Sequence, residues 1–187
     1  MKFTVEKNTL LKSLSHVQSI VEKRNTLPIL SNILLDAKEN SLILSATDMD
    51  ISITEKLNCN IIEEGSTTVS AHTLYDIIRK LPDTSEIEII SNDGKIISLR
   101  SGKSKFSLGC LPKKDFPIIE ISDLEIEINI DSHKFLRLMD KTRFAISNEE
   151  TRYFLNGIYF HKKKEDHSNL LSVVATDPTG GTELDDI

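Results

Sequence analysis

The sequence predicts an α+β protein in which antiparallel strands alternate with a few amphipathic helices. Short segments of alternating apolar and polar residues, rich in Ile, Leu and Val, indicate strands. Asn92-Asp93-Gly94 lies between two such segments and is a strong hairpin signal. Segments with apolar residues three and four apart indicate helices, and the same order of elements begins again after residue 117.

The expected elements follow one another along the chain. Residues 1–6 alternate and predict a strand, after which Asn8 or Thr9 can cap a helix that continues to about Val21. Residues 29–48 predict a hairpin with its turn at 38–40, and strand character continues through 49–62. A second helix is expected over about 72–81, ended by Pro82, before a second hairpin over 86–111. The Pro-bounded polar stretch 112–117 is the candidate linker.

The two parts of the chain share one residue register, which indicates an internal repeat. Apolar residues of the first part match apolar residues of the second part at a constant offset of 125 positions. The matched pairs are Val5 with Ile130, Leu10 with Phe135, Leu11 with Leu136, Leu14 with Met139, Leu30 with Leu155, Ile33 with Ile158, and Leu35 with Phe160. A longer turn then precedes the second copy of Ala-Thr-Asp, at 175–177 against 46–48. This register predicts a repeated domain whose second copy is about half as long as the first.

Composition and motifs exclude several classes of protein. A net charge of −6 argues against a protein that simply coats nucleic acid. No apolar run is long enough for a transmembrane helix and no secretory leader is present, so we expect a cytoplasmic protein without membrane association. Cys59 and Cys110 have no motif spacing and are expected to be free thiols. Phosphate-loop, dinucleotide-binding, zinc-protease and serine-hydrolase motifs are missing, so we expect neither an enzyme nor a cofactor.

One enzymatic alternative rests on Asp48 and Asp50, which a metal-dependent enzyme could use as paired ligands. The second copy of the repeat keeps Asp177 but has no partner for it, and the five histidines show no ligand spacing. Polar residues at the junction of two strands are therefore the favoured interpretation.

Basic residues gather on the polar faces of the expected helices. At about 100° per residue, Lys12, His16 and Lys23 lie opposite the apolar face of the first helix. Lys134, Arg137 and Lys141 form a stripe in the second copy, and the intervening helix exposes His72, Asp76, Arg79 and Lys80. A solvated face explains one such stripe. Equivalent stripes in an acidic chain leave two interpretations open: solvated faces, or a surface for a phosphate backbone, contacts to which carry no sequence information.

Longer motifs together resemble the bacterial beta sliding clamp family, the processivity subunits of DNA polymerase III. They are MKFTVEKNTLLKSL (1–14), TLPILSNILL (26–35), RSGKSKFSL (100–108), LPKKDFP (111–117) and RYFLNGIYF (152–160). The resemblance implies the DNA clamp fold, with repeated domains, antiparallel sheets outside and paired helices facing the DNA hole. In that family two subunits close head to tail into a ring. The implied partners are double-stranded DNA, the clamp loader and the polymerase III subunits.

The resemblance also implies roles for single residues. Those matching DNA-contacting positions are Arg24, His72, Glu149, Tyr153 and Phe154, supported by a basic face of Lys12, Arg79, Lys80, Arg137 and Lys141. The family often has Arg at the position of His72 and Gln at that of Glu149, so contact is expected to be weaker here, most of all at Glu149. Lys103, Lys105, Phe106 and Leu108 match the edge strand that meets the partner subunit. Leu155 and Thr176 match the groove that binds partner peptides.

The resemblance covers residues 1–177, as a complete first domain (1–120) and the N-terminal half of a second (121–177). The tail, 178–187, is polar and Gly-rich and is expected to be disordered. The expected protein is thus a truncated or defective clamp, for which a frameshift or an early stop is the favoured explanation. The alternative is a regulatory module whose first domain binds the third domain of a full-length clamp and blocks ring closure.

Overall fold

The computed structural model describes residues 1–22, 26–83, 85–117, 129–165, 168–177 and 182–186. The chain divides into two compact units, Met1–Ile121 (unit 1) and Ser122–Ile187 (unit 2), and each is described by itself. The division lies one residue beyond the expected end of the first domain.

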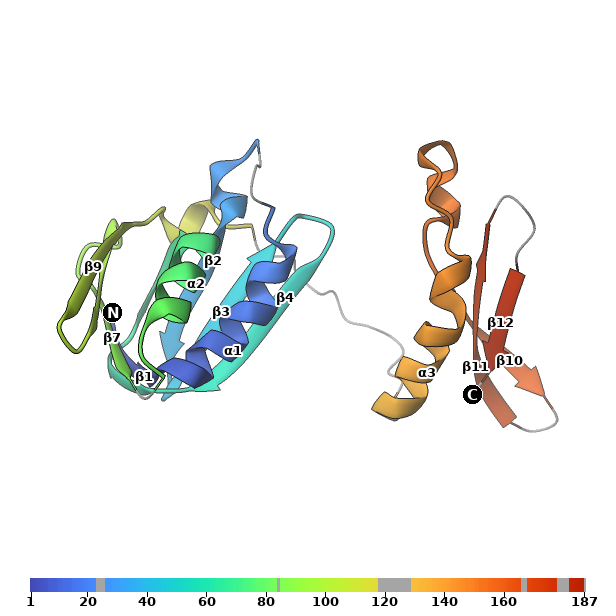
Figure 1. The fold of residues 1–187 in the computed structure, drawn as a ribbon, viewed down its shortest axis with the longest axis horizontal. Coiled ribbons are helices and arrows are strands. Elements are labelled where there is room, and N and C mark those ends of the chain that lie inside the picture. Colours follow the sequence, from blue (N-terminus) through green and yellow to red (C-terminus); the bar gives the residue numbers. More distant parts are fainter. Residues whose placement is uncertain (23–25, 84, 118–128, 166–167, 178–181, 187) are drawn as a thin grey trace. The chain divides into compact units, whose positions relative to one another are not determined.

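Unit 1 combines two antiparallel sheets with two α-helices that lie side by side (Figure 1). One sheet has the strand order β5-β1-β7-β8-β9 and the other has the order β4-β3-β2-β6. The helical elements are α1 (Lys7–Val17), η1 (Gln18–Ile20), η2 (Pro28–Ser31), α2 (Ala71–Lys80) and η3 (Lys113–Asp115). The strands are β1 (Lys2–Glu6), β2 (Asn32–Lys38), β3 (Ser41–Thr47), β4 (Ser52–Asn58), β5 (Asn60–Glu63), β6 (Gly65–Ser70), β7 (Glu86–Ser91), β8 (Ile96–Ser101) and β9 (Ser104–Gly109).

The core of unit 1 lies between the two helices and the two sheets. Leu10 and Leu14 of α1, Leu74 and Ile78 of α2, and Phe3 of β1 are all fully buried in one cluster. Helical spacing brings these apolar residues onto one side of each helix. The opposite sides, which carry Lys, Arg and His, are therefore turned away from the core.

The helix and turn predictions for unit 1 are largely confirmed. The turn at 38–40 has positive φ at Glu39 (49°) and Asn40 (63°), as a two-residue hairpin turn requires. In the second hairpin, Gly94 supplies a positive φ (71°) in the turn between β7 and β8. The second helix was expected over about 72–81, and α2 begins and ends one residue earlier. The first helix begins earlier than expected, at Lys7, and continues after Val17 as a tighter 3-10 turn.

The expected linker, 112–117, belongs to unit 1 instead. Phe116 is only 6% exposed, and Lys113 Nζ lies 3.1 Å from Asp36 Oδ2 of β2. Burial of the aromatic ring fixes this Pro-bounded stretch, although its composition is that of a linker.

Unit 2 consists of one α-helix beside a three-stranded antiparallel sheet within its described residues (Figure 1). The elements are α3 (Ser132–Thr142), η4 (Arg143–Ala145), η5 (Glu150–Leu155), β10 (Tyr159–Glu165), β11 (Ser168–Thr176) and β12 (Thr182–Asp186). The carboxylate of Asp131 accepts hydrogen bonds from the main-chain N–H groups of His133 and Lys134, so it caps α3.

The structure confirms the internal repeat. Helix α3 begins and ends 125 residues after α1. In unit 1 Leu35 pairs with Leu44 across the β2–β3 hairpin, and in unit 2 Phe160 pairs with Val173 across β10–β11. The first strand thus keeps the offset of 125 and the second has 129. The four additional residues do not lengthen the turn, as the sequence predicted, but extend each paired strand by two residues, because Glu165 pairs with Ser168 as Lys38 pairs with Ser41.

The tail differs from its expected disorder over residues 182–186, which form β12. This strand pairs with β11, where Thr176 lies opposite Thr182, just as Thr47 of β3 lies opposite Ser52 of β4. Main-chain N–H and C=O groups along β11 gain hydrogen-bond partners from this pairing, which needs no particular side chains. Strand β12 therefore takes the position in unit 2 that β4 has in unit 1.

Candidate nucleic-acid interface

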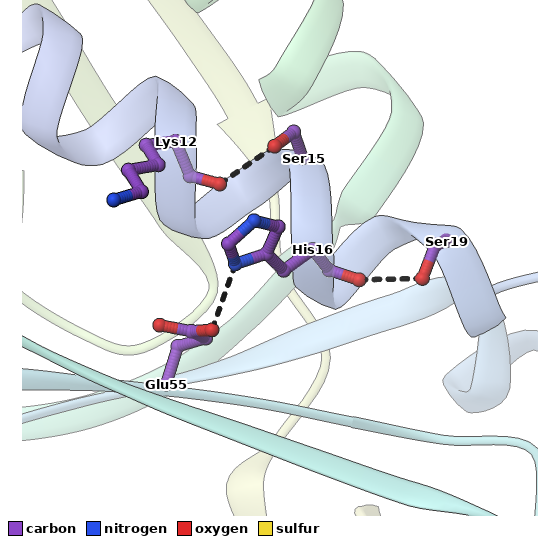
Figure 2. A network of polar contacts seen from close by, with 5 residues as sticks. All are labelled: Lys12, Ser15, His16, Ser19 and Glu55. Atoms are coloured by element: carbon purple, nitrogen blue, oxygen red, sulfur yellow. Dashed lines mark hydrogen bonds and ion pairs between the residues drawn. The ribbon is translucent and has the colours of Figure 1, made fainter. Parts of the chain in front are cut away.

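The exposed face of α1 carries Lys12, Ser15 and His16 at helical spacing, and Ser19 of η1 continues this face (Figure 2). Ser15 Oγ donates a hydrogen bond to the carbonyl oxygen of Lys12 (2.7 Å), and Ser19 Oγ donates to that of His16 (2.6 Å). Both hydroxyls are thus held against the helix. Helix α1 itself contains no acidic residue, so Lys12 is an exposed cation on a face otherwise free of helix carboxylates.

A contact between His16 and Glu55 joins this face to the four-stranded sheet. His16 Nδ1 lies 2.9 Å from Glu55 Oε1 of β4, and the histidine side chain is about half exposed (Figure 2). The contact fixes the imidazole, but it also places a carboxylate beside His16, one helical turn from Lys12. An approaching phosphate would therefore meet a less positive surface than the helix sequence suggests.

Helix α2 contributes Arg79 and Lys80, which are both exposed. Arg79 Nη2 lies 3.2 Å from Asp76 Oδ1, and its guanidinium stands 5.7 Å from the centre of the Tyr75 ring. Exposed ion pairs of this kind are weak, so Arg79 can exchange its partner for a phosphate at little cost.

His72 is half-buried, whereas the sequence predicted an exposed residue. Its Nδ1 lies 3.1 Å from Gln18 Oε1, and its Nε2 lies 3.0 Å from the carbonyl oxygen of Val21. The ring therefore connects the first turn of α2 to the end of the α1–η1 segment. It lines a hollow of about 500 Å³ together with Gln18, Ser19, Val21, Tyr75, Asp76 and Arg79.

In unit 2 the expected DNA-contacting residues lie on η5. Tyr153 and Phe154 are 79% and 72% exposed, and their rings meet edge to face with centroids 6.1 Å apart. Glu149 comes directly before η5, and its Oε2 lies 3.7 Å from Arg152 Nε. This pairing offsets part of the repulsion expected between Glu149 and DNA. Arg137 and Lys141 are exposed on α3.

Arg24 lies outside the described residues. The structure therefore gives no position for this DNA-contacting candidate.

The expected dimer edge is the outer strand of the five-stranded sheet. Strand β9 pairs with β8, and no described strand pairs with its other side. Lys103, which precedes the strand, and Lys105 are exposed, whereas Phe106 and Leu108 pack partly against the core. A hollow of about 460 Å³ between β9 and α2 is lined by Ser104, Phe106, His72, Thr73, Asp76, Ile77, Lys80, Leu81 and Pro82. This side of unit 1 thus offers main-chain groups for strand pairing beside an apolar recess.

The two expected groove residues line one hollow in unit 2. Leu155 and Thr176 are 21 positions apart, and both border a space of about 200 Å³ with Phe154, Gly157, Tyr159, His161, Val174 and Ala175. His161 Nδ1 is buried and has no hydrogen-bond partner among the described residues.

The metal-site interpretation gains no support from the geometry. Asp48 Oδ1 accepts hydrogen bonds from the main-chain N–H groups of Asp50 (3.0 Å) and Ile51 (2.7 Å). These bonds, first that from Ile51, lower the pKa of the Asp48 carboxyl, so this carboxylate stabilises a turn. The described residues contain no group of three or more His, Cys, Asp or Glu side chains that could hold a metal ion.

Both cysteines are free, as predicted. Burial raises the pKa of the Cys59 and Cys110 thiols, which disfavours the reactive thiolate. Across the described parts of the chain, no helix has the length and apolar character needed to cross a bilayer.

Sequence reasoning missed several residues around the helix faces. Ser15 and Ser19 could have been found, because they lie one turn from Lys12 and His16 on the same face. Tyr75 could also have been found, because it lies one turn before Arg79 on α2. Glu55 and Gln18 could not, since their places depend on contacts between distant segments.

A helix-and-sheet unit built twice, with exposed cations on the helices, defines a protein of the DNA clamp fold. Comparison with known protein families identifies the family within this fold. The family described as DNA polymerase III beta subunit matches with its N-terminal domain over residues 1–120 and with its central domain over residues 129–179. The chain belongs to this family.

Individual relatives agree with the assignment. The beta sliding clamp of Caulobacter vibrioides is 49% identical over 178 residues, which are 95% of this chain and 48% of the relative. That of Vibrio cholerae is 39% identical over 178 residues, 95% of this chain and 47% of the relative. A crystal structure of the Caulobacter crescentus beta sliding clamp superimposes with a TM-score of 0.95 at 47% identity, covering 100% of this chain and 50% of that one. The chain spans about half the length of the relatives it matches.

Proposed function

We propose that the chain provides the first domain and the beginning of the second domain of a sliding clamp. Such a ring encircles duplex DNA and tethers DNA polymerase III for processive synthesis. The supporting observation is that two family domains match in order over two units whose helices carry exposed cations. The role is not enzymatic, and it implies the cytoplasm as the site of action.

Sliding requires contacts that are weak and independent of sequence. Lys12, Arg79 and Lys80 would each neutralise a phosphate and release condensed counterions, an exchange that is readily reversed at the next phosphate. Tyr153 and Phe154 would add ring contacts to the sugar-phosphate chain. No contact of this set reads a base edge, so the clamp would not pause at particular sequences.

Closure of the ring would use β9. Its unpaired main-chain groups can continue the sheet into a second subunit, while Phe106 and Leu108 supply apolar contact beside the strand. In the family the partner surface belongs to the third domain.

The proposal can be tested with a chimaera in which residues 1–177 replace the matched part of the Caulobacter vibrioides relative. The chimaera is loaded by that organism's clamp loader onto nicked circular DNA, and the bound protein is measured by gel filtration. We expect retention on the circle and release when the circle is cut once, because a ring is held by topology and slides off an end.

Two controls give this experiment its meaning. The unmodified relative must load and release in the same way. A chimaera with Phe106→Asp should lose ring closure; because Phe106 also packs partly against the core of unit 1, its circular dichroism spectrum and urea midpoint must first be shown to match those of the parent. A chimaera that fails to load, or that stays bound to linear DNA, would contradict the proposal.

A second candidate is the regulatory module, which the unpaired side of β9 favours. In this role the 187-residue chain would bind to the third domain of a full-length clamp and prevent closure of the ring. Sedimentation velocity of the chain mixed with full-length relative should then show a heterodimer that Phe106→Asp removes. A mixture in which both proteins sediment as they do alone rules this role out.

A further inference from the structure

The imidazole of His72 is placed differently from the other basic side chains of unit 1 that were expected at DNA. Lys12, Arg79 and Lys80 are exposed on their helices, whereas His72 is half-buried and lines the hollow between η1 and α2. Its Nδ1 lies 3.1 Å from Gln18 Oε1, and its Nε2 lies 3.0 Å from the carbonyl oxygen of residue 21. Both ring nitrogens thus have partners within the protein, and neither is left to donate to a phosphate.

The two partners of the imidazole differ in the hydrogen bonds that they can make. The main-chain carbonyl of Val21 only accepts, so Nε2 of His72 carries a proton and donates it. The side-chain amide of Gln18 can turn either its oxygen or its nitrogen toward Nδ1, and it therefore pairs with the neutral ring and with the charged ring. We call these two hydrogen bonds the latch.

The latch joins a weakly anchored segment to a firmly anchored helix. None of the three residues of η1 (Gln18–Ile20) is buried, and Val21 is the first buried residue after them. His72, in contrast, belongs to the first turn of α2, in which Ala71 and Leu74 are 0% exposed. The polar side of η1 is therefore fixed to α2 by the latch.

The hollow beside the latch separates the basic faces of two helical segments. Its lining comes from η1, where Ser19 continues the face that carries Lys12, and from α2, which contributes Arg79. Phosphates recur at regular intervals along a DNA strand, so cations on two elements can meet them together only at certain separations. The separation of η1 from α2 therefore matters for the whole face.

We propose that His72 is a positioning residue of the DNA interface and contacts no phosphate itself. Through Gln18 and Val21 it holds the α1–η1 segment and α2 at the separation at which their cations meet the phosphates together. The inference rests on the proposed function, and it gives this position a different role from the DNA contact that the resemblance implied. When the latch opens, only a fraction of the molecules is correctly spaced, which lowers the affinity by that fraction but leaves the number of neutralised phosphates unchanged.

Four variants separate hydrogen bonding from the filling of space. His72→Leu fills a similar volume and makes neither hydrogen bond, whereas His72→Gln keeps a side-chain amide that can donate to Val21. Gln18→Leu removes the other partner and leaves the ring in place. Thr73→Val is the matched control for the free chain, because Thr73 follows His72 directly and its hydroxyl bonds that of Ser70 rather than η1.

Hydrogen exchange of the full 187-residue chain tests the latch without DNA. We expect exchange over residues 18–22 to become about two- to tenfold faster in His72→Leu and in Gln18→Leu, which corresponds to the loss of one ordinary hydrogen bond. Exchange over 74–80 should stay at the parental rate, and Thr73→Val should leave the rates over 18–22 unchanged. Parental exchange over 18–22 in His72→Leu overturns the proposal.

The effect on DNA is measured with the chimaera described above, by fluorescence anisotropy on a duplex at several salt concentrations. We expect His72→Leu to lower the affinity about two- to tenfold at each salt concentration while the slope of log affinity against log salt stays parental. His72→Gln should recover most of this loss. A slope reduced by about 0.9 in His72→Leu would show that the ring itself neutralises a phosphate, and the proposal would then be wrong. It would also be wrong if His72→Leu bound as the parent does, or if His72→Gln bound no better than His72→Leu.

Failure of the proposed function gives a different result. In that case the parental chimaera does not load onto circular DNA, and the positioning role of His72 is lost with it. When the parental chimaera loads, the slopes, affinities and exchange rates of the variants alone decide the role of His72.

Discussion

Equivalent positions in the two units allow one prediction to be worked out quantitatively. Leu10 of α1 and Phe135 of α3 occupy the same place in the repeat, but their exposed fractions are 0% and 38%. We expect Leu10→Ala to destabilise unit 1 more than Phe135→Ala destabilises unit 2. The order is unusual, because phenylalanine has the larger side chain.

The magnitudes follow from burial. Replacing a fully buried leucine by alanine removes its transfer free energy and leaves a cavity, which together cost about 2–5 kcal/mol. A buried phenylalanine would cost about 3–5 kcal/mol, but more than a third of Phe135 is already in water, and removal of a partly exposed ring leaves no closed cavity. We therefore expect about 3–4 kcal/mol for Leu10→Ala and about 1–2 kcal/mol for Phe135→Ala.

Hydrogen exchange at increasing urea concentrations measures both changes separately, through peptides from each unit. A single transition for the whole chain would be hard to interpret, since a protein of two units need not unfold in one step. Should Phe135→Ala cost as much as Leu10→Ala, the Phe135 ring is covered in solution and the reasoning from exposure is refuted.

Three other changes test the charged groups. In the ring-forming chimaera, Lys12→Gln should lower the slope of log affinity against log salt by about 0.9 for each phosphate that the side chain no longer neutralises. Fluorescence anisotropy on two duplexes of unrelated sequence should show the same change in slope. A change on one sequence alone would be inconsistent with binding to the DNA backbone. Glu55→Gln removes the carboxylate beside His16 and should tighten duplex binding at low salt, a difference that disappears at high salt if it is electrostatic. Asp83→Asn removes the partner of the buried Lys7, whose Nζ lies 2.6 Å from Asp83 Oδ1 and lowers the pKa of that carboxyl. Because the folded pKa is lowered, this stabilisation is complete above the usual carboxyl pKa of about 4 and is lost as the pH falls through the lowered value. Urea midpoints of the variant and the parent should therefore differ at neutral pH and converge in acid.

Local signals carried most of the fold prediction. Helix α2 and both hairpin turns depend on Pro82, on apolar spacing and on residues that accept positive φ, all of which can be read within a few positions. The constant offset of 125 then predicted the second unit from the first. The predicted linker at 112–117 was wrong, because the composition of a polar stretch between prolines does not show that one of its rings, Phe116, is buried in the core.

The candidate site was less predictable, for a physical reason. Periodicity predicts which side chains point away from the core, but it does not predict which residues they contact. His72 was expected at the surface and instead bridges Gln18 and Val21, and Glu55 of strand β4 contacts His16 of helix α1. Such contacts join segments 39 to 54 positions apart and depend on the whole fold.

The place beside the central strand of each repeat is filled by SITEKLN in unit 1 and by TELDD in unit 2. These two sequences have little in common, yet each begins its pairing opposite the threonine of Ala-Thr-Asp. The place is therefore defined by the free main-chain hydrogen-bonding groups of the neighbouring strand rather than by one particular sequence. Unrelated peptides attached after residue 177 should be accommodated there too, which makes the position a natural acceptor for grafted strands.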